Sequence, residues 1–296
     1  MPVPQRIAIT GASGLIGTAL VGHLKSEGHT VQRLVRRTPI SADEVQWDPQ
    51  TGFVDLEPLR GVDAIIHLAG VGVGDKRWNK KYKSEILNSR LLGTTAIAHA
   101  VAELKPQVFI SASAIGWYGE SGNRAVVETD RAGDDFLAAV CREWEGAADL
   151  AGDTRTVKIR TGLVLDPTGG ALGKMLPLFR LGLGGKMGNG KQWWSWITLH
   201  DQIRAIVFAL ENPISGPVNL TAPNPVTNQE FTSALARAMH RPALFPVPGI
   251  ALKIALGGFS SEILGSKKVI PHALQEAGFT WDYPHISEAL GKLVED

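Results

Sequence analysis

The sequence predicts an α/β fold in which helices cover both faces of a doubly wound parallel sheet, with a smaller C-terminal lobe on the substrate side. First, short β-branched segments alternate with segments of helical periodicity through the first half of the chain, the order expected of such a sheet. Second, residues 64–68 and 108–110 form strongly apolar runs without polar alternation, as strands buried on both faces do. Third, a glycine-rich turn joins the first strand to the first helix. Together these features predict a Rossmann-type sheet.

The elements follow from these patterns in chain order. The predicted strands cover residues 6–10, 30–35, 64–68, 107–111, 156–160 and 218–220. The predicted helices cover residues 15–27, 83–103, 136–150, 201–210, 228–240 and 286–293.

The domain division rests on composition. Residues 168–196 are rich in Gly and Trp, and the tail from Ala222 onward is rich in Pro, which indicates departures from the regular sheet. We therefore expect a dinucleotide-binding domain over residues 1–165, to which 196–222 return, and a substrate-side lobe formed by 166–195 and 223–296.

The balance of charges and the cysteine content make some classes of function improbable. The 296 residues include 30 basic and 29 acidic side chains, so no nucleic-acid or membrane surface is expected, and a small-molecule partner is favoured. The single Cys141 and the lack of zinc-type spacing argue against a metal site and favour a reducing compartment, the cytoplasm. The first residues lack the apolar stretch of a signal peptide. A homodimer is compatible with the sequence.

The glycine turn carries the first functional prediction. Gly11, Gly14 and Gly17 lie between a strand and a helix, where they allow a tight turn, close approach of a pyrophosphate and close helix–strand packing. The predicted cofactor contacts here are Gly11, Ser13, Gly14, Leu15, Ile16 and Gly17.

Two arginines predict which nicotinamide dinucleotide is bound. The second strand ends in Arg36 and Arg37, where an NAD-selective site usually offers an acidic residue to the ribose hydroxyls. Guanidinium groups suit a 2′-phosphate, so NADP(H) is predicted. The alternative is a solvated pair of surface charges.

Several segments together resemble the extended short-chain dehydrogenase/reductase superfamily. More narrowly, the chain looks like its atypical subfamily labelled sugar-nucleotide epimerase family or cell-division-inhibitor-like, which ends in a short domain of unknown function. The segments that carry the resemblance are residues 10–17, 47–49, 66–70, 77–78, 89–90, 111–119, 144–145, 160–167, 169–172 and 192–197.

The resemblance implies further cofactor contacts. Leu68 and Ala69 would flank the adenine-side ribose, Arg90 stands where relatives often carry Asn, and residues 161–163 (Thr161, Gly162 and Leu163) would lie near the nicotinamide. Leu68 and Ala69 could instead be core residues, and Arg90 could be a charge on the surface of a helix.

Catalysis is where the chain departs from the superfamily. Ordinary members carry Tyr-x-x-x-Lys on one helix, in which the phenol exchanges a proton with the substrate, but the alignment places Leu137 and Cys141 at these positions. Ser113 and Tyr118 remain as catalytic candidates, with Tyr118 either a proton donor or a pocket wall.

Two interpretations of function stay open. The first is an NADP(H)-dependent oxidoreductase or epimerase-like enzyme acting on an unidentified small molecule by hydride transfer at C4 of the nicotinamide. The second is a non-catalytic NADPH-binding sensor or regulator, which the missing Tyr and Lys favour. Residues 182–191, rich in glycine, fit either a flap over a pocket or an anchored surface loop.

Overall fold

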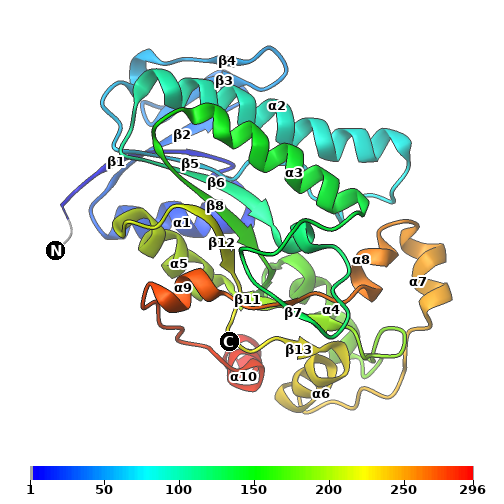
Figure 1. Ribbon diagram of the computed structural model, residues 1–296. Helices are drawn as coiled ribbons and strands as arrows, with labels where there is room; N and C mark the ends of the chain where they lie inside the picture. The colour runs from blue at the N-terminus through cyan, green and yellow to red at the C-terminus, as the bar shows by residue number, and fades with distance from the viewer. Residues whose placement is uncertain (1–2, 296) are drawn as a thin grey trace.

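An eight-stranded sheet runs through the centre of the protein (Figure 1). The computed structural model describes residues 3–295, so Met1 and Pro2 of the predicted first domain and Asp296 of the predicted lobe lie outside it. The strand order is β12-β8-β6-β5-β1-β2-β3-β4, and neighbouring strands are parallel except for the β3–β4 pair at one edge. The predicted doubly wound α/β fold is confirmed. The strands of this sheet are β1 (Arg6–Thr10), β2 (Thr30–Val35), β3 (Glu44–Asp48), β4 (Phe53–Val54), β5 (Ala64–His67), β6 (Val108–Ala114), β8 (Arg155–Thr161) and β12 (Gly216–Leu220).

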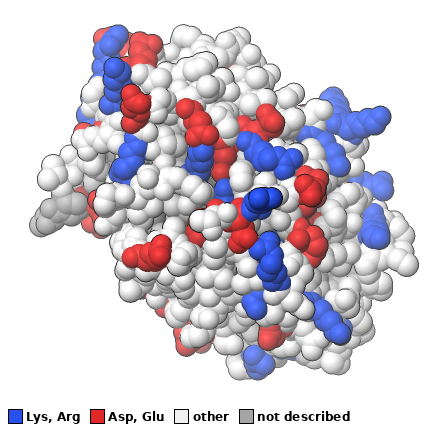
Figure 2. Space-filling view, viewed as in Figure 1, with Lys and Arg blue, Asp and Glu red and all other residues white. Residues whose placement is uncertain are grey.

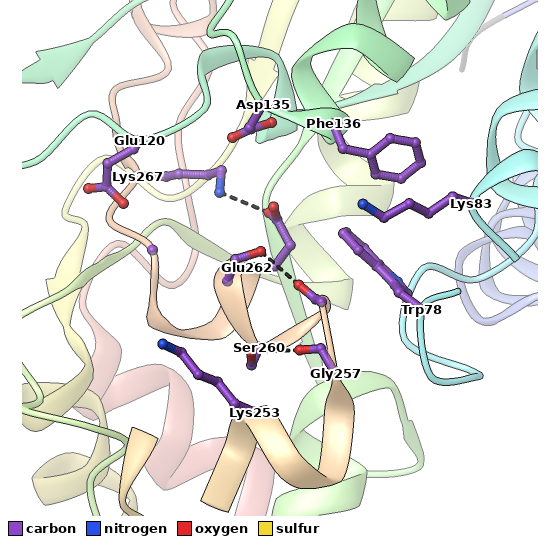
Figure 3. Close-up of a pocket in the computed structure, with 13 residues that line it drawn as sticks. Trp78, Lys83, Glu120, Asp135, Phe136, Lys253, Gly257, Ser260, Glu262 and Lys267 are labelled. Carbon is purple, nitrogen blue, oxygen red and sulfur yellow. Dashed lines mark hydrogen bonds and ion pairs between the residues drawn. The ribbon is translucent and has the colours of Figure 1, made fainter. Parts of the chain in front are cut away.

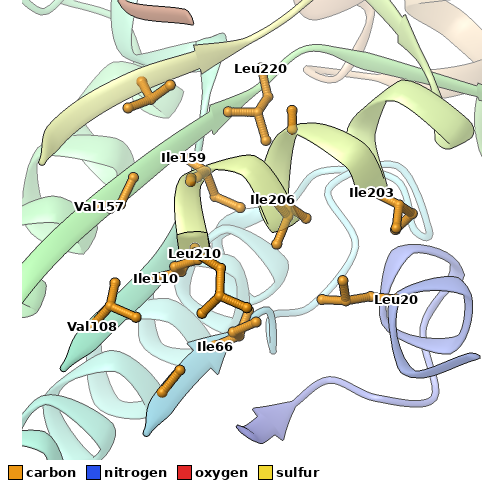
Figure 4. Packing of buried hydrophobic residues seen from close by; sticks show 14 of the residues in the cluster. Leu20, Ile66, Val108, Ile110, Val157, Ile159, Ile203, Ile206, Leu210 and Leu220 are labelled. Carbon is orange, nitrogen blue, oxygen red and sulfur yellow. The ribbon is translucent and has the colours of Figure 1, made fainter. Parts of the chain in front are cut away.

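Helices cover both faces of the sheet, which explains the apolar character of its strands. Helices α1 (Leu15–Ser26) and α5 (Leu199–Glu211) lie on one face, and α2 (Lys80–Leu104) and α3 (Phe136–Ala148) lie on the other (Figure 1). In β1, Ile7 and Ile9 join the core cluster beneath α1 and α5, whereas Ala8 joins the cluster beneath α2. Figure 4 shows the first cluster, in which Leu20 and Ile206 face the apolar side chains of the sheet.

The second lobe has a separate core of its own. Trp196 and Phe231 are fully buried at its centre, between α4 (Gly170–Arg180), α6 (Asn228–Ala238) and α10 (Ile286–Glu295). The lobe also carries α7 (Gly249–Leu256) and α8 (Ser260–Leu264). The remaining short elements are η1 (Glu57–Leu59), η2 (Ile115–Tyr118), β7 (Ala125–Val126), η3 (Asp149–Ala151), β9 (Leu163–Asp166), β10 (Trp193–Trp194), β11 (Trp196–Thr198), β13 (Val226–Thr227), β14 (Lys268–Val269) and α9 (His272–Glu276).

The chain departs from the sequence-based description in three ways. Leu274 and Phe279 pack into the main core rather than the lobe, because α9 lies against β12 at the end of the sheet. Helix α5 begins at Leu199, and Thr198 accepts a hydrogen bond from the Asp201 backbone as its N-cap. The α-helices and strands that were not predicted are β3, β4, β7, β9, β10, β11, β13, β14, α4, α7, α8 and α9.

The glycine-rich segment 182–191 is an anchored loop. Its backbone exchanges hydrogen bonds with Val247, which accepts from Gly188 and donates to Lys186. Gln192 Nε2 also donates to the Met187 carbonyl at 2.9 Å. The loop therefore packs on the segment that leads into α7. Among residues 3–295, no helix combines the length and the apolar character needed to cross a membrane.

Candidate cofactor-binding site

Each of the three glycines in the turn is needed for a different reason. Gly11 has a φ of 69°, and a Cβ there would lie 2.8 Å from the backbone carbonyl carbon of Leu68. A Cβ at Gly17 would collide with the backbone of Gly11, because α1 starts directly against the turn. Gly14 differs, since the atom nearest to a Cβ there is the Gly11 carbonyl oxygen at 3.4 Å. Gly11 and Gly17 thus fix the turn, whereas Gly14 leaves open space beside it.

The start of α1 offers unshared backbone donors to an anion. Gly14 is the N-cap and supplies no side-chain hydrogen bond, and the first turn has no acidic residue. The amides of a first helical turn and the positive end of the helix dipole attract negative charge. This end of α1 therefore suits a phosphate group.

A large hollow opens in front of this turn. This hollow, the glycine-turn cleft, has a volume of about 1210 Å³ and is bounded by the ends of β1, β2, β3 and β5 and by the N-terminal half of α2. Its lining includes these predicted cofactor residues: Gly11, Ser13, Gly14, Arg36, Arg37, Leu68 and Ala69. Leu15, Ile16 and Gly17 form the first turn of α1 next to it.

The two arginines at the end of β2 differ in their surroundings. Arg37 forms a two-point ion pair with Glu44 of β3, with Nη1–Oε2 at 2.8 Å and Nη2–Oε1 at 2.6 Å. These hydrogen bonds lower the pKa of the Glu44 carboxyl below its usual value. Arg36 is exposed and has no hydrogen-bonding or ionic partner within the described residues. Arg36 is therefore the guanidinium that is free to bind a ligand.

A buried threonine positions the strand end that faces the glycine turn. Thr10 Oγ1 accepts hydrogen bonds from the amides of Leu68 and Ala69, at 3.1 and 3.2 Å. Its hydroxyl pairs with His67 Nδ1 at 2.7 Å, and burial lowers the pKa of His67 to about 3. His67 is thus a neutral core residue that helps Thr10 hold Leu68 and Ala69 at the cleft.

The loop that follows is held by side chains of α2. Arg90 Nη1 donates to the Val71 carbonyl at 2.9 Å, and the Val71 amide donates to Ser89 Oγ at 3.2 Å. The Arg90 guanidinium lies 4.7 Å from the ring centre of Trp144 on α3, and burial lowers its pKa. Arg90 does not line the cleft, so its contacts support the loop from behind.

The predicted nicotinamide-side residues lie at the end of β8, outside the lining of this cleft. Thr161 Oγ1 accepts a hydrogen bond from Gln202 Nε2 at 3.2 Å. A Cβ at Gly162 would lie 2.8 Å from the Ser195 carbonyl oxygen, and Leu163 is partly buried against the core of the lobe. Residues 161–163 therefore form the corner where the sheet meets the second lobe.

Ser113 and Tyr118 belong to one buried hydrogen-bond network. Ser113 Oγ donates to Glu145 Oε1 at 2.6 Å, and Tyr118 Oη donates to Asn219 Oδ1 at 2.6 Å. Arg160 joins the two halves, because Nε bonds Glu145 at 2.8 Å and Nη1 donates to Tyr118 Oη at 3.1 Å. All five side chains are at most 5% exposed.

This burial determines how Tyr118 ionises. It raises the pKa of Tyr118 to about 12. Neither Ser113 nor Tyr118 lines the glycine-turn cleft. Their geometry is that of structural polar groups and gives no support to the proton-donor alternative for Tyr118.

Comparison with known proteins places the chain in a family. A model described as the NAD dependent epimerase/dehydratase family matches residues 7–138, and a domain of unknown function (DUF1731) matches residues 247–293. An epimerase family protein of Mycobacterium leprae is 46% identical over 289 residues, which cover 96% of this chain and 94% of that protein. The chain belongs to the epimerase/dehydratase family.

Two further members of the epimerase/dehydratase family match the chain over almost its whole length. The chloroplastic SDR39U1 homologue of Arabidopsis thaliana is 37% identical, covering 98% of this chain and 86% of that protein. The crystal structure of human epimerase family protein SDR39U1 with NADPH superimposes with a TM-score of 0.91 at 33% identity, covering 98% of this chain and 99% of that chain. The resemblance found in the sequence is confirmed.

Helix α3 is where the sequence resemblance predicts the Tyr-x-x-x-Lys positions of ordinary superfamily members. Leu137 and Cys141, at the tyrosine and lysine positions, are both buried. Cys141 Sγ lies 3.6 Å from the Ala114 carbonyl oxygen, and burial raises the pKa of the thiol to about 12. Both positions are thus occupied by packing side chains, without an ionised group.

Some residues of the cleft were not recognised from sequence. Trp47, Pro49 and Gln50 line it from the β3–β4 edge, and Lys76 and Lys81 line it from the start of α2. In the sequence, the Trp47-Asp48-Pro49 segment contributes only to the family resemblance. The run of lysines around the start of α2 was a local signal for a basic rim.

Proposed function

We propose that the chain binds NADP(H) in the glycine-turn cleft, with its pyrophosphate at the start of α1 and its 2′-phosphate at Arg36. The observation that carries this proposal is the difference between the surroundings of Arg36 and those of Arg37 at the end of β2. Arg36 has no partner within residues 3–295, and Arg37 occupies both carboxylate oxygens of Glu44. The acidic side chain near this position is therefore not available to ribose hydroxyls, and its charge is compensated.

The chemistry of the cleft fits each part of this cofactor. The open space at Gly14 and the unshared amides of α1 suit the pyrophosphate. Apolar atoms of Leu68 and Ala69 suit the adenosine portion. The human relative solved with NADPH, which shares the fold over nearly the full chain, supports the same choice.

The activity we propose is that of an NADP(H)-dependent oxidoreductase or epimerase-like enzyme acting on a small molecule. When bound, the nicotinamide supplies or accepts a hydride at C4. Thr161, Gly162 and Leu163 are proposed to face its ring from the end of β8, and Arg90 to hold the loop that follows β5. We propose a cytoplasmic, reducing setting because the chain has a single cysteine, Cys141, and so cannot form an intrachain disulfide.

A second candidate is an NADPH-dependent regulator without turnover. It is favoured by the packing of Leu137 and Cys141 at the Tyr and Lys positions and by the engagement of the Tyr118 hydroxyl with Asn219. The two functions differ in one measurement, which is NADPH oxidation above background across a panel of ketones, aldehydes, quinones and nucleotide sugars. Turnover supports the enzyme, whereas micromolar or tighter NADPH binding without turnover supports the regulator.

A further inference from the structure

The outer edge of the second lobe presents large apolar side chains to solvent. They belong to the loop that follows α4, to the segment that leads into α7, and to α7 itself, which lie at the side of the lobe away from the sheet (Figure 1). Each of these side chains is more than half exposed, and together they are called the apolar edge: Leu181, Leu183, Leu244, Phe245, Ile250 and Ile254. Apolar side chains gathered on one surface indicate an interaction site.

Helix α7 shows most clearly that this edge is uncovered. Among the residues of α7, Leu252 alone is buried, and Ile250 and Ile254 lie on the opposite side of the helix because they are four residues apart. The corner after α7 is closed by a hydrogen bond from Ser260 Oγ to the Gly257 carbonyl at 2.7 Å (Figure 3). The backbone of Gly257 also pairs with the segment before α2. The helix is therefore held in place while two isoleucines point into solvent.

The backbone beneath the apolar edge is already paired. The Phe245 amide donates to the Gly184 carbonyl at 3.3 Å, and the Val247 amide donates to the Lys186 carbonyl at 2.8 Å. These bonds place the loop after α4 beside the segment that leads into α7. Unpaired backbone groups make the transfer of a protein surface out of water costly. Because the backbone here is paired, the apolar edge can enter an apolar environment.

The chain segments that carry the apolar edge contain no acidic residue. Residues 167–200 include four Lys or Arg side chains and residues 231–261 include three, and neither segment has an Asp or a Glu. Three of these cations stand close in the chain to residues of the edge, and they are Arg180, Lys186 and Arg241. None of the three has a carboxylate partner in the part of the chain that the structure describes.

Acidic residues of other segments do not cancel this charge. The acids that share a hollow with Lys253 or border the second segment are Glu120, Asp135, Glu230 and Glu262. Glu262 is paired with Lys267 at 2.9 Å, and the three that remain are fewer than the cations of the two segments. In Figure 2 the edge of the molecule where α7 lies carries blue and white atoms, and the red atoms lie further in. The charge around the apolar edge is therefore positive, although the whole chain is nearly balanced.

From these features we propose that the apolar edge binds the surface of an anionic lipid bilayer. The apolar side chains enter the boundary between the headgroups and the acyl chains, and Arg180, Lys186 and Arg241 contact anionic headgroups. Helix α7 is too short to cross a bilayer, so the chain lies on its surface. The sequence-based expectation of no membrane surface used the charge of the whole chain and does not describe this edge.

Other occupants fit this edge less well. A second copy of the chain would bring two positively charged edges together. A protein partner binds most strongly where anchor side chains fill pockets, but none of the apolar edge lines the glycine-turn cleft or the hollow in Figure 3. A bilayer accepts protruding aliphatic side chains in any arrangement.

Flotation of the full chain with lipid vesicles tests the proposal. Vesicles of phosphatidylcholine mixed with an equal amount of phosphatidylglycerol should bind the chain at least about tenfold more tightly than vesicles of phosphatidylcholine alone, and added salt should weaken this binding. The double variant Ile250→Ser/Ile254→Ser should weaken binding to the mixed vesicles by about tenfold or more. Arg180→Gln and Arg241→Gln should each weaken it by about fivefold.

Two matched controls replace exposed residues far from the apolar edge. Leu150→Ser changes a leucine in η3, and Lys105→Gln changes a lysine at the end of α2. Both should bind mixed vesicles like the unmodified chain. The unfolding midpoints of all these variants should stay close to that of the unmodified chain, because every replaced side chain is exposed.

A fluorescent label locates the contact on the chain. In Ile254→Cys, a polarity-sensitive fluorophore on the new thiol should shift its emission to shorter wavelength when mixed vesicles are added. The same label on Leu150→Cys should not shift. The natural Cys141 is buried, so the labelling reaction is directed to the introduced thiol.

Four results would overturn the proposal: no binding to mixed vesicles, equal binding to both kinds of vesicle, unchanged binding by the isoleucine double variant, or the same emission shift at both labels. A dimer in sedimentation that Ile250→Ser/Ile254→Ser dissociates would also overturn it and would assign the edge to a second copy. The vesicle experiments need no NADPH, so their outcome is independent of the proposed cofactor.

Discussion

Glu44 and Arg37 form a two-point ion pair at the rim of the glycine-turn cleft, in which each carboxylate oxygen of Glu44 accepts a hydrogen bond from a different nitrogen of Arg37. Arg33 Nη2 also lies 3.3 Å from Glu44 Oε1. The side chain of Glu44 is 2% exposed, whereas that of Arg37 is 52% exposed. The pair therefore neutralises a nearly buried acid next to the exposed guanidinium of Arg36. This arrangement assigns different tasks to two adjacent arginines.

Replacement of Arg36 should change cofactor preference. We expect Arg36→Met to weaken NADPH binding by about 1.5–3 kcal/mol, roughly 10- to 150-fold, because a charged hydrogen bond to phosphate is lost. NADH binding should change by less than about twofold, since NADH carries no 2′-phosphate. Fluorescence titrations with both cofactors measure this difference. If Arg36→Met loses the same affinity for NADPH and for NADH, Arg36 does not bind the 2′-phosphate.

Replacement of Arg37 should act through Glu44. Arg37→Met leaves Glu44 with Arg33 as its remaining cationic partner, at 3.3 Å from Oε1. The carboxylate charge is then less compensated, so it should repel the 2′-phosphate and weaken NADPH binding. The double variant Arg37→Met/Glu44→Gln removes that charge and should recover most of the lost affinity. Failure of the second substitution to restore binding would mean that Arg37 contacts the phosphate directly.

The three glycines should respond differently to a side chain. Gly14→Val should abolish NADPH binding and leave the unfolding midpoint close to that of the unmodified chain, because the new side chain enters the open space in front of α1. Gly17→Ala should instead lower the free energy of unfolding by about 1–3 kcal/mol, since its Cβ meets the Gly11 backbone. Binding titrations and chemical denaturation of both variants separate these effects. Retention of full NADPH affinity by Gly14→Val would place the cofactor elsewhere.

Contacts between residues that are close in the chain could be predicted from the sequence, whereas contacts between distant residues could not. The turn from Gly11 to Gly17 was predictable, because its strand, loop and helix are adjacent in the chain. The difference between Arg36 and Arg37 was not, since it depends on Glu44 in β3, a strand without a clear periodic signal. Charge pairing across neighbouring strands requires knowledge of their register, in this case Arg33 opposite Glu44.

The position of Tyr118 required even longer-range information. Its hydroxyl bonds Asn219, which lies 101 residues further along the chain. Tyr118 ends η2, which follows β6 at the carboxyl end of the sheet, where ligands commonly bind. The sequence could not show that β12 and Arg160 would turn the side chain into the interior. The absence of Tyr and Lys from α3, by contrast, was readable from the sequence directly.

Cys141 should make unfolding more sensitive to alkaline pH. Burial raises the pKa of its thiol to about 12 in the folded chain, whereas an unfolded cysteine ionises near its ordinary pKa of about 8.5. The unfolded chain therefore binds fewer protons between these values, and the stability contributed by the neutral thiol, complete at lower pH, is lost as pH rises through this window.

The comparison with Cys141→Ala isolates this effect. The slope of the free energy of unfolding against pH should be steeper in the unmodified chain, by up to about 1.4 kcal/mol per pH unit. Urea denaturation at several pH values from 8 to 10 measures both slopes. Identical slopes would show that the thiol ionises as easily in the folded chain. A loss of NADPH turnover in Cys141→Ala, with Tyr118→Phe fully active, would instead indicate a thiol-based mechanism.

Tyr118→Phe decides between the structural and catalytic roles of this hydroxyl. Removal of the phenol oxygen leaves Asn219 Oδ1 without its donor and removes one of the two hydrogen bonds of Arg160 Nη1, which still donates to the Glu128 carbonyl. We therefore expect a loss of about 1–3 kcal/mol in the free energy of unfolding. NADPH affinity, and turnover of any substrate found in the panel, should stay within about threefold of the unmodified chain. Removal of a general acid would instead lower turnover by roughly 10²–10⁴-fold. Ser113→Ala is the matched control, because Ser113 donates to Glu145 in the same network and should likewise reduce stability alone. If Tyr118→Phe loses turnover on that scale while its unfolding curve is unchanged, the hydroxyl must reach the substrate, and the buried network describes a resting state that opens for catalysis.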